Sequence, residues 1–318
     1  MTATEDRGPR TETASSPHVE LRDASRWYGN VVAVNAITCT LAPGITGLLG
    51  PNGAGKSTVL HMLAGLLAPS AGQVLIDGEH AAGNPGIYRK LGLVPEREAV
   101  QTFLTGFEFV RMNAKLQNLD NPDDAAKRAI ALVDLESAQD RRVGTYSKGM
   151  RQRIKIAGAL VHEPSILLLD EPFNGMDPRQ RLQMMEMLRD MGDRGCTVLI
   201  SSHILEELND LAASVLVMVA GRLAASGHFR EIRKLMTNRP HTFTLKSSND
   251  RKLAAELISE PSVQSVDLEK GGLAIRTSDR SVFTRALPRR ARDAEIRIHE
   301  LLPTDESLES VFNYLVQR

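Results

Sequence analysis

The sequence predicts an α/β fold in which helices cover a mostly parallel sheet, followed by a smaller α+β domain. Three observations support this prediction. Apolar runs of strand length, such as residues 45–49 and 214–219, alternate with stretches of helical periodicity, and such alternation is typical of parallel sheets covered on both faces. A glycine-rich turn separates the first of these strands from a helix. A β-α-β-β-α-β rhythm then follows residue 240.

The N-terminal third begins with a polar segment and then turns to β structure. Residues 1–17 are rich in Thr, Ser, Glu, Arg and Pro, so we expect a disordered tail. Strands are expected between residues 19 and 41, where apolar and polar side chains alternate along residues 37–41. After the strand at 45–49 and the glycine-rich turn comes a predicted helix with the apolar positions Leu60, Leu63, Leu66 and Leu67.

The middle of the chain predicts a helical subdomain at about residues 100–160. Its pattern is mainly helical, with breaks at Asn121-Pro122 and Val143-Gly144. Alternating strands and helices then resume. Strands are expected at residues 165–169, 197–201 and 214–219, and helices at residues 179–191, 205–213 and 229–236.

The turn residues Asn238-Arg239-Pro240 predict a domain boundary. The remainder, residues 241–318, is predicted to form a small accessory α+β domain of ferredoxin-like topology. Its strands are expected near residues 241–246, 263–268, 272–276 and 295–301, and its helices near 251–259, 279–287 and 305–316.

Composition limits the functions that fit. A chain of 318 residues with 42% hydrophobic side chains suggests two domains with ordinary cores. Basic and acidic side chains number 39 each, which argues against a dedicated nucleic-acid binder. Cys39 and Cys196 are far apart and lack metal-ligand spacing, as expected of reduced thiols in a cytosolic protein. No apolar run approaches the ~20 residues of a membrane helix, so we expect any membrane role to depend on a partner.

A phosphate-binding loop is predicted after the strand at 45–49. The run Gly50-Pro51-Asn52-Gly53-Ala54-Gly55-Lys56-Ser57 fits the Walker A pattern. Glycines let backbone N–H groups surround phosphate oxygens at a helix N-terminus, whose dipole favours anions. Lys56 would supply charge to the β- and γ-phosphates, and Ser57 its hydroxyl to Mg²⁺. The alternative is a chance glycine turn, but the flanking strand and helix favour nucleotide binding by this run and Thr58.

Two acids predict the other half of the site. Asp170 and Glu171 come directly after the buried strand at 165–169, which is the Walker B arrangement. Asp170 would hold Mg²⁺ through water at the carboxyl end of the strand, where open α/β sheets bind ligands. Glu171 would polarise the attacking water as a general base. Taken alone, this pair is equally typical of a strand that ends in two solvated acids. The phosphate loop in the same chain favours the interpretation that the two acids act in catalysis.

With these two motifs, four further features resemble the ABC ATPase family in their order along the chain. They are the signature-like run TYSKGMRQR at 145–153, NGMD at 174–177, His203 after the strand VLISS, and Tyr28 upstream of the phosphate loop. The resemblance covers about residues 19–225. It implies a P-loop NTPase of ABC type, with an antiparallel β subdomain beside the parallel core and an ATPase domain at residues 18–240.

The resemblance also implies a dimer. In the family, the residues matching Ser147 and Gly149 bind the γ-phosphate of ATP held by a second subunit, and Asp177 of the D-loop is a further candidate for nucleotide binding. Two copies, or one copy and a paralogous subunit, then enclose two ATP molecules head to tail. A simple N-cap is the alternative role for Ser147, and the two roles are compatible because a helix N-terminus also binds anions.

Two further residues receive roles from the resemblance. His203 would contact the γ-phosphate and keep the attacking water and Glu171 aligned with it. The alternative is that His203 is a polar surface residue at a turn. Tyr28 would stack on adenine, which needs little more than its position. Trp27 is adjacent and competes for this role, and an exposed turn aromatic is the plain alternative.

Three positions depart from the common family pattern. Glu96 stands where the family usually has Gln, and a carboxylate can contact Mg²⁺ or its water, although a solvated loop acid is an equal alternative. Lys148 and Met150 replace Gly and Gln of the signature motif. This variant resembles ATPases of drug, antibiotic, lipid or polysaccharide exporters whose membrane subunit is a separate chain. The run at 305–312 resembles their closing helix, or is an ordinary amphipathic helix.

These features predict the ATP-binding and ATP-hydrolysing subunit of an ABC transporter, most simply an exporter. Its expected cofactors are ATP and Mg²⁺, and its expected place is the cytoplasmic face of the cell membrane, bound to an integral-membrane subunit. Thr105, Phe107 and Phe109 are candidate contacts with that subunit, unless the aromatic rings pack the helical subdomain. The alternatives are a soluble ABC protein acting on translation or DNA, and a regulatory switch that binds ATP without transport. No nucleic-acid partner is expected.

Overall fold

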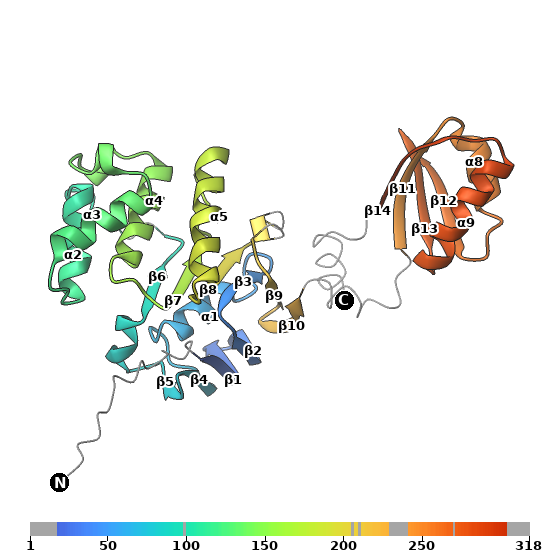
Figure 1. Ribbon diagram of the computed structural model, residues 1–318. Coiled ribbons are helices and arrows are strands. Elements are labelled where there is room, and N and C mark those ends of the chain that lie inside the picture. The colour runs from blue at the N-terminus through green and yellow to red at the C-terminus, as the bar shows by residue number, and fades with distance from the viewer. Residues whose placement is uncertain are drawn as a thin grey trace, which may run out of the picture.

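The computed structural model describes residues 18–97, 100–204, 207–208, 211–228, 241–269 and 271–303 (Figure 1). Several predictions concern segments outside these residues: the tail at 1–17, the helices at 229–236 and 305–316, and the boundary at 238–240. The predicted helix at 205–213 lies only partly within them.

A six-stranded sheet forms the centre of the N-terminal part, in the order β10-β9-β3-β8-β7-β6. All neighbours pair in parallel except β9 and β10, which are antiparallel. The strands are β3 (Gly44–Leu49), β6 (Leu91–Val94), β7 (Ile166–Asp170), β8 (Thr197–Ser202), β9 (Ser214–Val219) and β10 (Arg222–His228). The mostly parallel core predicted from the apolar runs is therefore confirmed.

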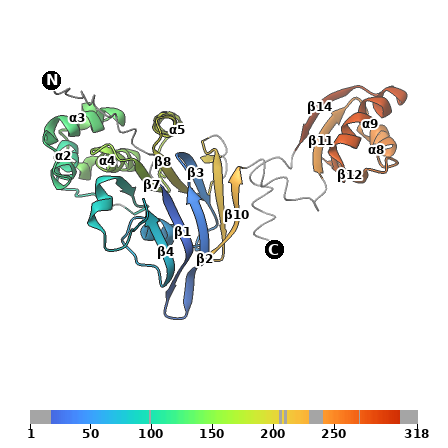
Figure 2. The same cartoon turned by 60° about the horizontal axis from the view of Figure 1, so that its bottom comes forward.

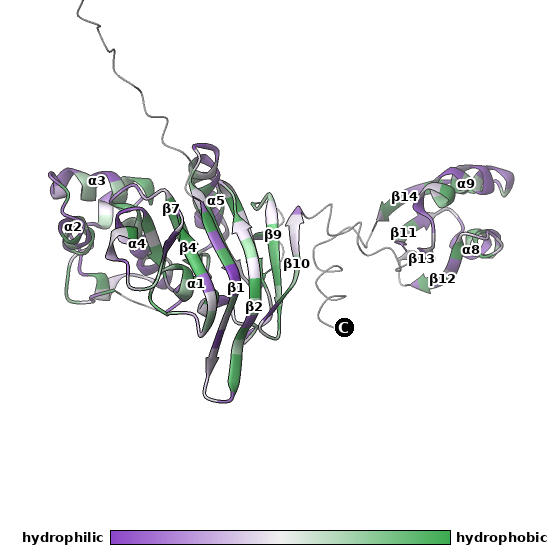
Figure 3. Cartoon of the chain, turned by 90° about the horizontal axis from the view of Figure 1, so that it is seen from below, coloured by the Kyte–Doolittle hydropathy of each residue, from purple (hydrophilic) through white to green (hydrophobic). Residues whose placement is uncertain are grey.

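A second sheet is antiparallel, in the order β2-β1-β4-β5. Its strands are β1 (Val19–Tyr28), β2 (Val31–Leu41), β4 (Ala71–Ile76) and β5 (Glu79–His80), and a short 3-10 helix, η1 (Pro85–Arg89), follows. The hairpin between β1 and β2 projects from the sheet, and its β2 arm is strongly hydrophobic (Figures 2 and 3). Its exposed apolar residues include Trp27, Tyr28, Val31 and Val32.

The helix α1 (Lys56–Leu63) packs between these sheets in one apolar cluster. The sequence predicted a longer helix through Leu66 and Leu67, and this was wrong. Gly65 adopts φ +68°, and a Cβ there would lie 2.4 Å from the carbonyl oxygen of Ala81. The helix therefore ends before Gly65, which leaves Leu66 exposed.

The helical layer contains α2 (Gly106–Leu116), α3 (Pro122–Leu132) and α4 (Lys148–Leu160), with short 3-10 turns η2 (Glu136–Ala138) and η3 (Val143–Thr145). Side-chain caps begin each α-helix: Thr105 in a capping box, Asn121 and Ser147. Phe109 is buried in the core, as the packing alternative for these aromatics expected. The helix α5 (Pro178–Asp193) packs on the six-stranded sheet (Figures 1 and 2).

The C-terminal residues form a third, four-stranded sheet in the order β12-β13-β11-β14, all antiparallel. Two helices cover it, and hydrophilic residues predominate in both (Figure 3). The elements are β11 (His241–Ser247), α8 (Asp250–Leu257), β12 (Val263–Glu269), β13 (Gly272–Thr277), α9 (Arg280–Asp293) and β14 (Ile298–Pro303). This order is that of a split β-α-β, so the predicted ferredoxin-like topology is confirmed.

Candidate nucleotide site

A cavity of about 390 Å³ opens at the carboxyl ends of β3, β7 and β8. Its walls come from the phosphate loop, the loop after β6, the end of β7 and the turn after β8. The residues that line it are Ala33, Asn52, Gly53, Ala54, Gly55, Lys56, Ser57, Thr58, Glu96, Asp170, Glu171 and His203. The phosphate loop, predicted to bind the nucleotide, and the acids after β7, predicted to hold the metal and activate water, therefore meet in one cavity although they are more than 100 residues apart in the sequence.

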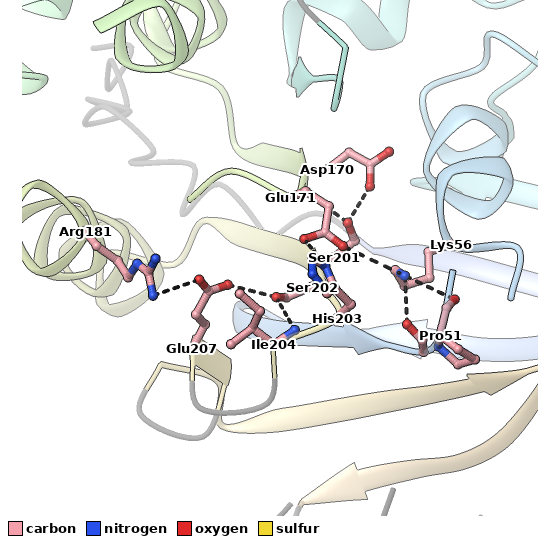
Figure 4. A network of polar contacts seen from close by, with 11 residues as sticks. Pro51, Lys56, Asp170, Glu171, Arg181, Ser201, Ser202, His203, Ile204 and Glu207 are labelled. Carbon is pink, nitrogen blue, oxygen red and sulfur yellow. Dashed lines mark hydrogen bonds and ion pairs between the residues drawn. The ribbon is translucent and has the colours of Figure 1, made fainter. Parts of the chain in front are cut away.

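The phosphate loop requires glycine at its last turn. Gly55 has φ +101°, and a Cβ there would lie 2.4 Å from the carbonyl oxygen of Ala33. Directly after it, Lys56 begins α1 and is buried. Its Nζ donates to the carbonyl oxygens of Gly50 and Pro51, at 2.8 and 3.4 Å (Figure 4). Burial lowers the pKa of Lys56, and the acids Glu171, Asp170 and Glu96 oppose that shift.

The two acids after β7 share one hydroxyl, that of Ser201 on the neighbouring strand β8. Its Oγ donates to the carboxylate of Asp170 and accepts from the backbone N–H of Glu171, at 3.0 Å in the second case. Glu171 adopts φ +49°, an uncommon conformation for a residue with a side chain. The hydroxyl of Ser201 thus stabilises the strained turn that directs Glu171 into the cavity.

Glu171 lies between two candidate catalytic partners (Figure 4). Its Oε2 lies 2.9 Å from His203 Nδ1, and its Oε1 lies 3.9 Å from Lys56 Nζ. Burial raises the pKa of Glu171, while the hydrogen bond and charge of His203 and the charge of Lys56 lower it. Asp170 raises it further. A carboxyl group with a raised pKa is a stronger base than an ordinary glutamate, as activation of water requires.

Glu96 reaches the cavity on a loop that a buried lysine holds. Lys155, in α4, donates to three successive carbonyl oxygens, those of Pro95, Glu96 and Arg97, at 2.6, 3.4 and 3.2 Å. No sequence motif pointed to Lys155 as part of the site. Its signal was a charged side chain between Ile154 and Ile156 in an otherwise apolar stretch of the helix.

Ser147, Gly149 and Asp177 lie outside the set of residues that line the cavity. Ser147 caps α4 and accepts from the N–H of Met150 at 3.2 Å, while Asp177 caps α5. A Cβ on Gly149 would lie 2.9 Å from the backbone carbonyl oxygen of Gly175, in the segment before α5. Glycine is therefore required where α4 approaches the segment before α5, in addition to any contact with phosphate.

Tyr28 also lies outside the cavity lining. Its side chain is exposed near the tip of the β1–β2 hairpin, beside the equally exposed Trp27. The Arg26 guanidinium lies 4.9 Å from the centre of the Tyr28 ring, which is a cation–π contact. The two aromatic rings therefore remain alternatives for contact with a base.

Further polar residues were missed because they act through neighbours of the predicted ones. Ser202 Oγ donates to Glu207 Oε2 at 2.8 Å, and Glu207 Oε1 lies 3.2 Å from Arg181 Nη1 in α5 (Figure 4). An acid four residues after His203 in a predicted helix carries no sequence signal of its own. The contact between Glu207 and Arg181 becomes visible only once α5 packs beside the end of β8.

The donor set of the cavity fits Mg²⁺ bound together with a nucleotide. Among the described residues, no group of three or more His, Cys, Asp or Glu side chains forms a metal cage. Mg²⁺ takes few protein ligands and completes its shell with waters and phosphate oxygens. Ser57, Asp170 and Glu96 offer oxygen atoms to one cavity beside the phosphate loop, which is the number and kind of donor that such an ion uses.

No helix in the described part of the chain is both long and apolar enough to span a membrane.

Comparison with known proteins identifies the family. Residues 34–174 match the family described as ABC transporter. Over 301 residues the chain is 33% identical to the daunorubicin/doxorubicin resistance ATP-binding protein DrrA of Streptomyces peucetius, covering 92% of this chain and 91% of that one.

A second relative and a solved structure also point to the ABC transporter family. The chain is 32% identical to the bacitracin transport ATP-binding protein BcrA of Enterococcus faecalis, covering 94% of this chain and 96% of that one. A solved ATP-binding subunit of an ABC transporter superposes with a TM-score of 0.63 at 29% identity, over 68% of this chain and 92% of that one. The chain therefore belongs to the ABC transporter family, and it is an ATP-binding, ATP-hydrolysing subunit of that family.

Proposed function

We propose that this chain powers an exporter whose membrane-spanning subunit is a separate chain. The observation that carries the proposal is the meeting of the phosphate loop, Asp170, Glu171 and His203 in one cavity. The relatives support the exporter assignment, since one is named for drug resistance and another for bacitracin transport, and the chain matches more than nine-tenths of each.

Within the site, we assign roles by geometry and charge. Lys56 and the loop N–H groups of residues 50–58 would hold the triphosphate, and Ser57 and Asp170 would hold Mg²⁺, with Glu96 as a third oxygen donor. When bound, Mg²⁺ supplies charge neutralisation on the phosphates. Glu171 would take the proton of the attacking water, and His203 would orient that carboxylate through its Nδ1 contact.

The site of one copy would be completed by another copy or by a paralogous subunit. Ser147 and Gly149 lie at the N-terminus of α4, where a helix dipole and free N–H groups attract anions. Neither residue lines the nucleotide cavity of its own chain. The phosphate that Ser147 and Gly149 bind would therefore belong to the nucleotide of the partner subunit. Asp177 would act at the same interface. Tyr28 would stack on the adenine.

We also propose how the chain divides. The ATPase domain would span residues 18–240, with a helical subdomain at about 100–160, and the accessory domain residues 241–318. The separate apolar cluster formed only by residues beyond 240 supports this division. The membrane subunit would place the chain at the cytoplasmic face of the membrane. Phe103 is 71% exposed in the segment before α2, which favours it over buried Phe109 as a docking residue.

The experiment is affinity purification of the full chain from detergent-solubilised membranes, followed by an ATPase assay of the recovered complex in lipid vesicles. We expect a co-purified multi-helix membrane protein and Mg²⁺-dependent hydrolysis that Lys56→Ala abolishes. A chain recovered alone that hydrolyses ATP would refute the transport proposal. A chain that binds ATP without turnover would instead favour the regulatory switch.

A further inference from the structure

The turn that carries His203 is fixed by a fully buried hydroxyl, that of Ser202. Its Oγ accepts a hydrogen bond from the backbone N–H of Ile204 at 3.0 Å. A serine side chain that bonds two residues ahead in this way closes a tight turn over the residue between them. That intervening residue is His203, so this bond helps to determine where its imidazole points.

A buried acid determines the direction of the Ser202 hydroxyl. Glu207 Oε2 lies 2.8 Å from Ser202 Oγ, and an ionised carboxylate can only accept. The hydroxyl hydrogen therefore points to Glu207, which leaves the lone pairs of Oγ for the N–H of Ile204. Removing the carboxylate would free the hydroxyl to rotate and would weaken the turn.

Arg181 compensates the buried charge of Glu207. The carboxylate side chain is 5% exposed, and burying a charge is costly unless it is paired. Arg181 Nη1 lies 3.2 Å from Glu207 Oε1. Arg181 lies in the first turns of α5, the helix that Asp177 caps, so the contacts run from α5 through Glu207 to the turn (Figure 4).

We propose that Arg181, Glu207 and Ser202 form a positioning relay that holds His203 Nδ1 against the Glu171 carboxylate. The proposal rests on the hydrolytic role proposed for Glu171. None of the three residues lines the nucleotide cavity, so they act through His203 and are positioning residues. Their loss should impair the chemical step while leaving the binding of ATP intact.

The test compares Ser202→Ala and Glu207→Ala in the full chain, assayed in its membrane complex. We expect kcat to fall about 10- to 100-fold, with the KM for ATP within about twofold of the unmodified value. Glu207→Gln should retain most of kcat, because its amide oxygen still accepts from Ser202.

A matched control breaks an Arg–Glu ion pair of similar length elsewhere. Glu260→Ala removes the 3.1 Å contact with Arg290 in the C-terminal part, and it should leave kcat and the KM for ATP unchanged. An unchanged kcat in Ser202→Ala and Glu207→Ala would overturn the relay. So would a rise in the KM for ATP as large as the loss of kcat, since a merely structural role produces that result.

A second measurement does not depend on turnover. In chains with isotope-labelled histidine, the ring signals of His203 report its hydrogen bonding directly, and His203→Gln identifies them. We expect Ser202→Ala and Glu207→Ala to shift these signals and Glu260→Ala to leave them in place. Unshifted signals would overturn the relay. An unmodified complex that fails to hydrolyse ATP would count against the proposed function, while these spectra would still decide the positioning of His203.

Discussion

The ammonium of Lys155 lies 2.6 Å from the carbonyl oxygen of Pro95, a residue 60 positions earlier in the chain. It also bonds the next two carbonyls, so one side chain of α4 holds three residues of the loop that brings Glu96 to the cavity. This contact connects the helix that begins at Ser147 with the proposed metal side of the nucleotide site.

Replacing this lysine should therefore loosen the loop. Lys155→Met keeps the length of the side chain but removes all three donors, so we expect the free energy of unfolding to fall by about 1–3 kcal/mol. ATP hydrolysis should also require a higher Mg²⁺ concentration. Urea denaturation and Mg²⁺ titration of the ATPase rate measure the two effects. Lys127→Met, at an exposed position of α3, is the control, and equal results for the two variants would contradict the role of Lys155.

Glu171→Gln should trap an ATP-bound dimer. The amide preserves the shape of the side chain but cannot take a proton from water, so hydrolysis should fall by at least about 100-fold while ATP still binds. Gel filtration with Mg·ATP should then show a species of twice the mass. Glu186→Gln, at an exposed position of α5, should behave as the unmodified chain does. A Glu171→Gln chain that stays monomeric and turns over normally would remove Glu171 from catalysis.

The raised pKa of Glu171 predicts the direction in which the stability of the fold changes with pH. Burial places it above the ordinary value of 4.5, so the folded state favours the protonated carboxyl. This preference stabilises the fold at low pH and is lost as pH rises through the raised pKa. Glu171→Gln stays neutral, so its Tm relative to the unmodified chain should increase over that pH range. A constant difference in Tm from pH 4 to pH 8 would show that the pKa is not raised.

The two exposed aromatic rings of the hairpin can be separated experimentally. Trp27 is the only tryptophan of the chain, so selectively excited tryptophan fluorescence of the isolated chain reports on this hairpin. ATP should change that signal if the base binds here. Tyr28→Ala should weaken ATP binding by about 1–3 kcal/mol, the usual contribution of a stacked base. Trp27→Phe should leave the affinity for a fluorescent ATP analogue unchanged, and the reverse pattern would assign the stacking to Trp27.

Local patterns predicted much of the fold because local chemistry determines it. The strand β9 occupies the predicted residues 214–219 because the apolar run ends at the turn residues Ala220 and Gly221. Breaks at Asn121-Pro122 marked the start of α3 because Asn caps and Pro suits the first helical turn. In contrast, the end of α1 depends on how Gly65 packs against Ala81, which no local pattern contains.

The residues of the candidate site also fall into two groups, those that local sequence reveals and those that only tertiary packing brings together. The phosphate loop and the acids after β7 were recognisable because their backbone conformations and chemistry come from adjacent residues. Lys155 and Glu207 were not, because each acts on a segment that only tertiary packing brings near it. Ser201 was likewise hidden, since a serine at the end of a strand gains its role only from the acids of the neighbouring strand.

The place of β6 in its sheet has a mechanical consequence. This strand ends the order β10-β9-β3-β8-β7-β6 and pairs only along Leu91–Val94 with β7. Displacing it breaks one short ladder, whereas moving β3 breaks two. A force applied to the helical layer would therefore be transmitted through α4 and Lys155 to the Glu96 loop. The phosphate loop after β3 would stay in place. Movement of the helical layer would thus reach the nucleotide site by way of this edge strand and the Glu96 loop.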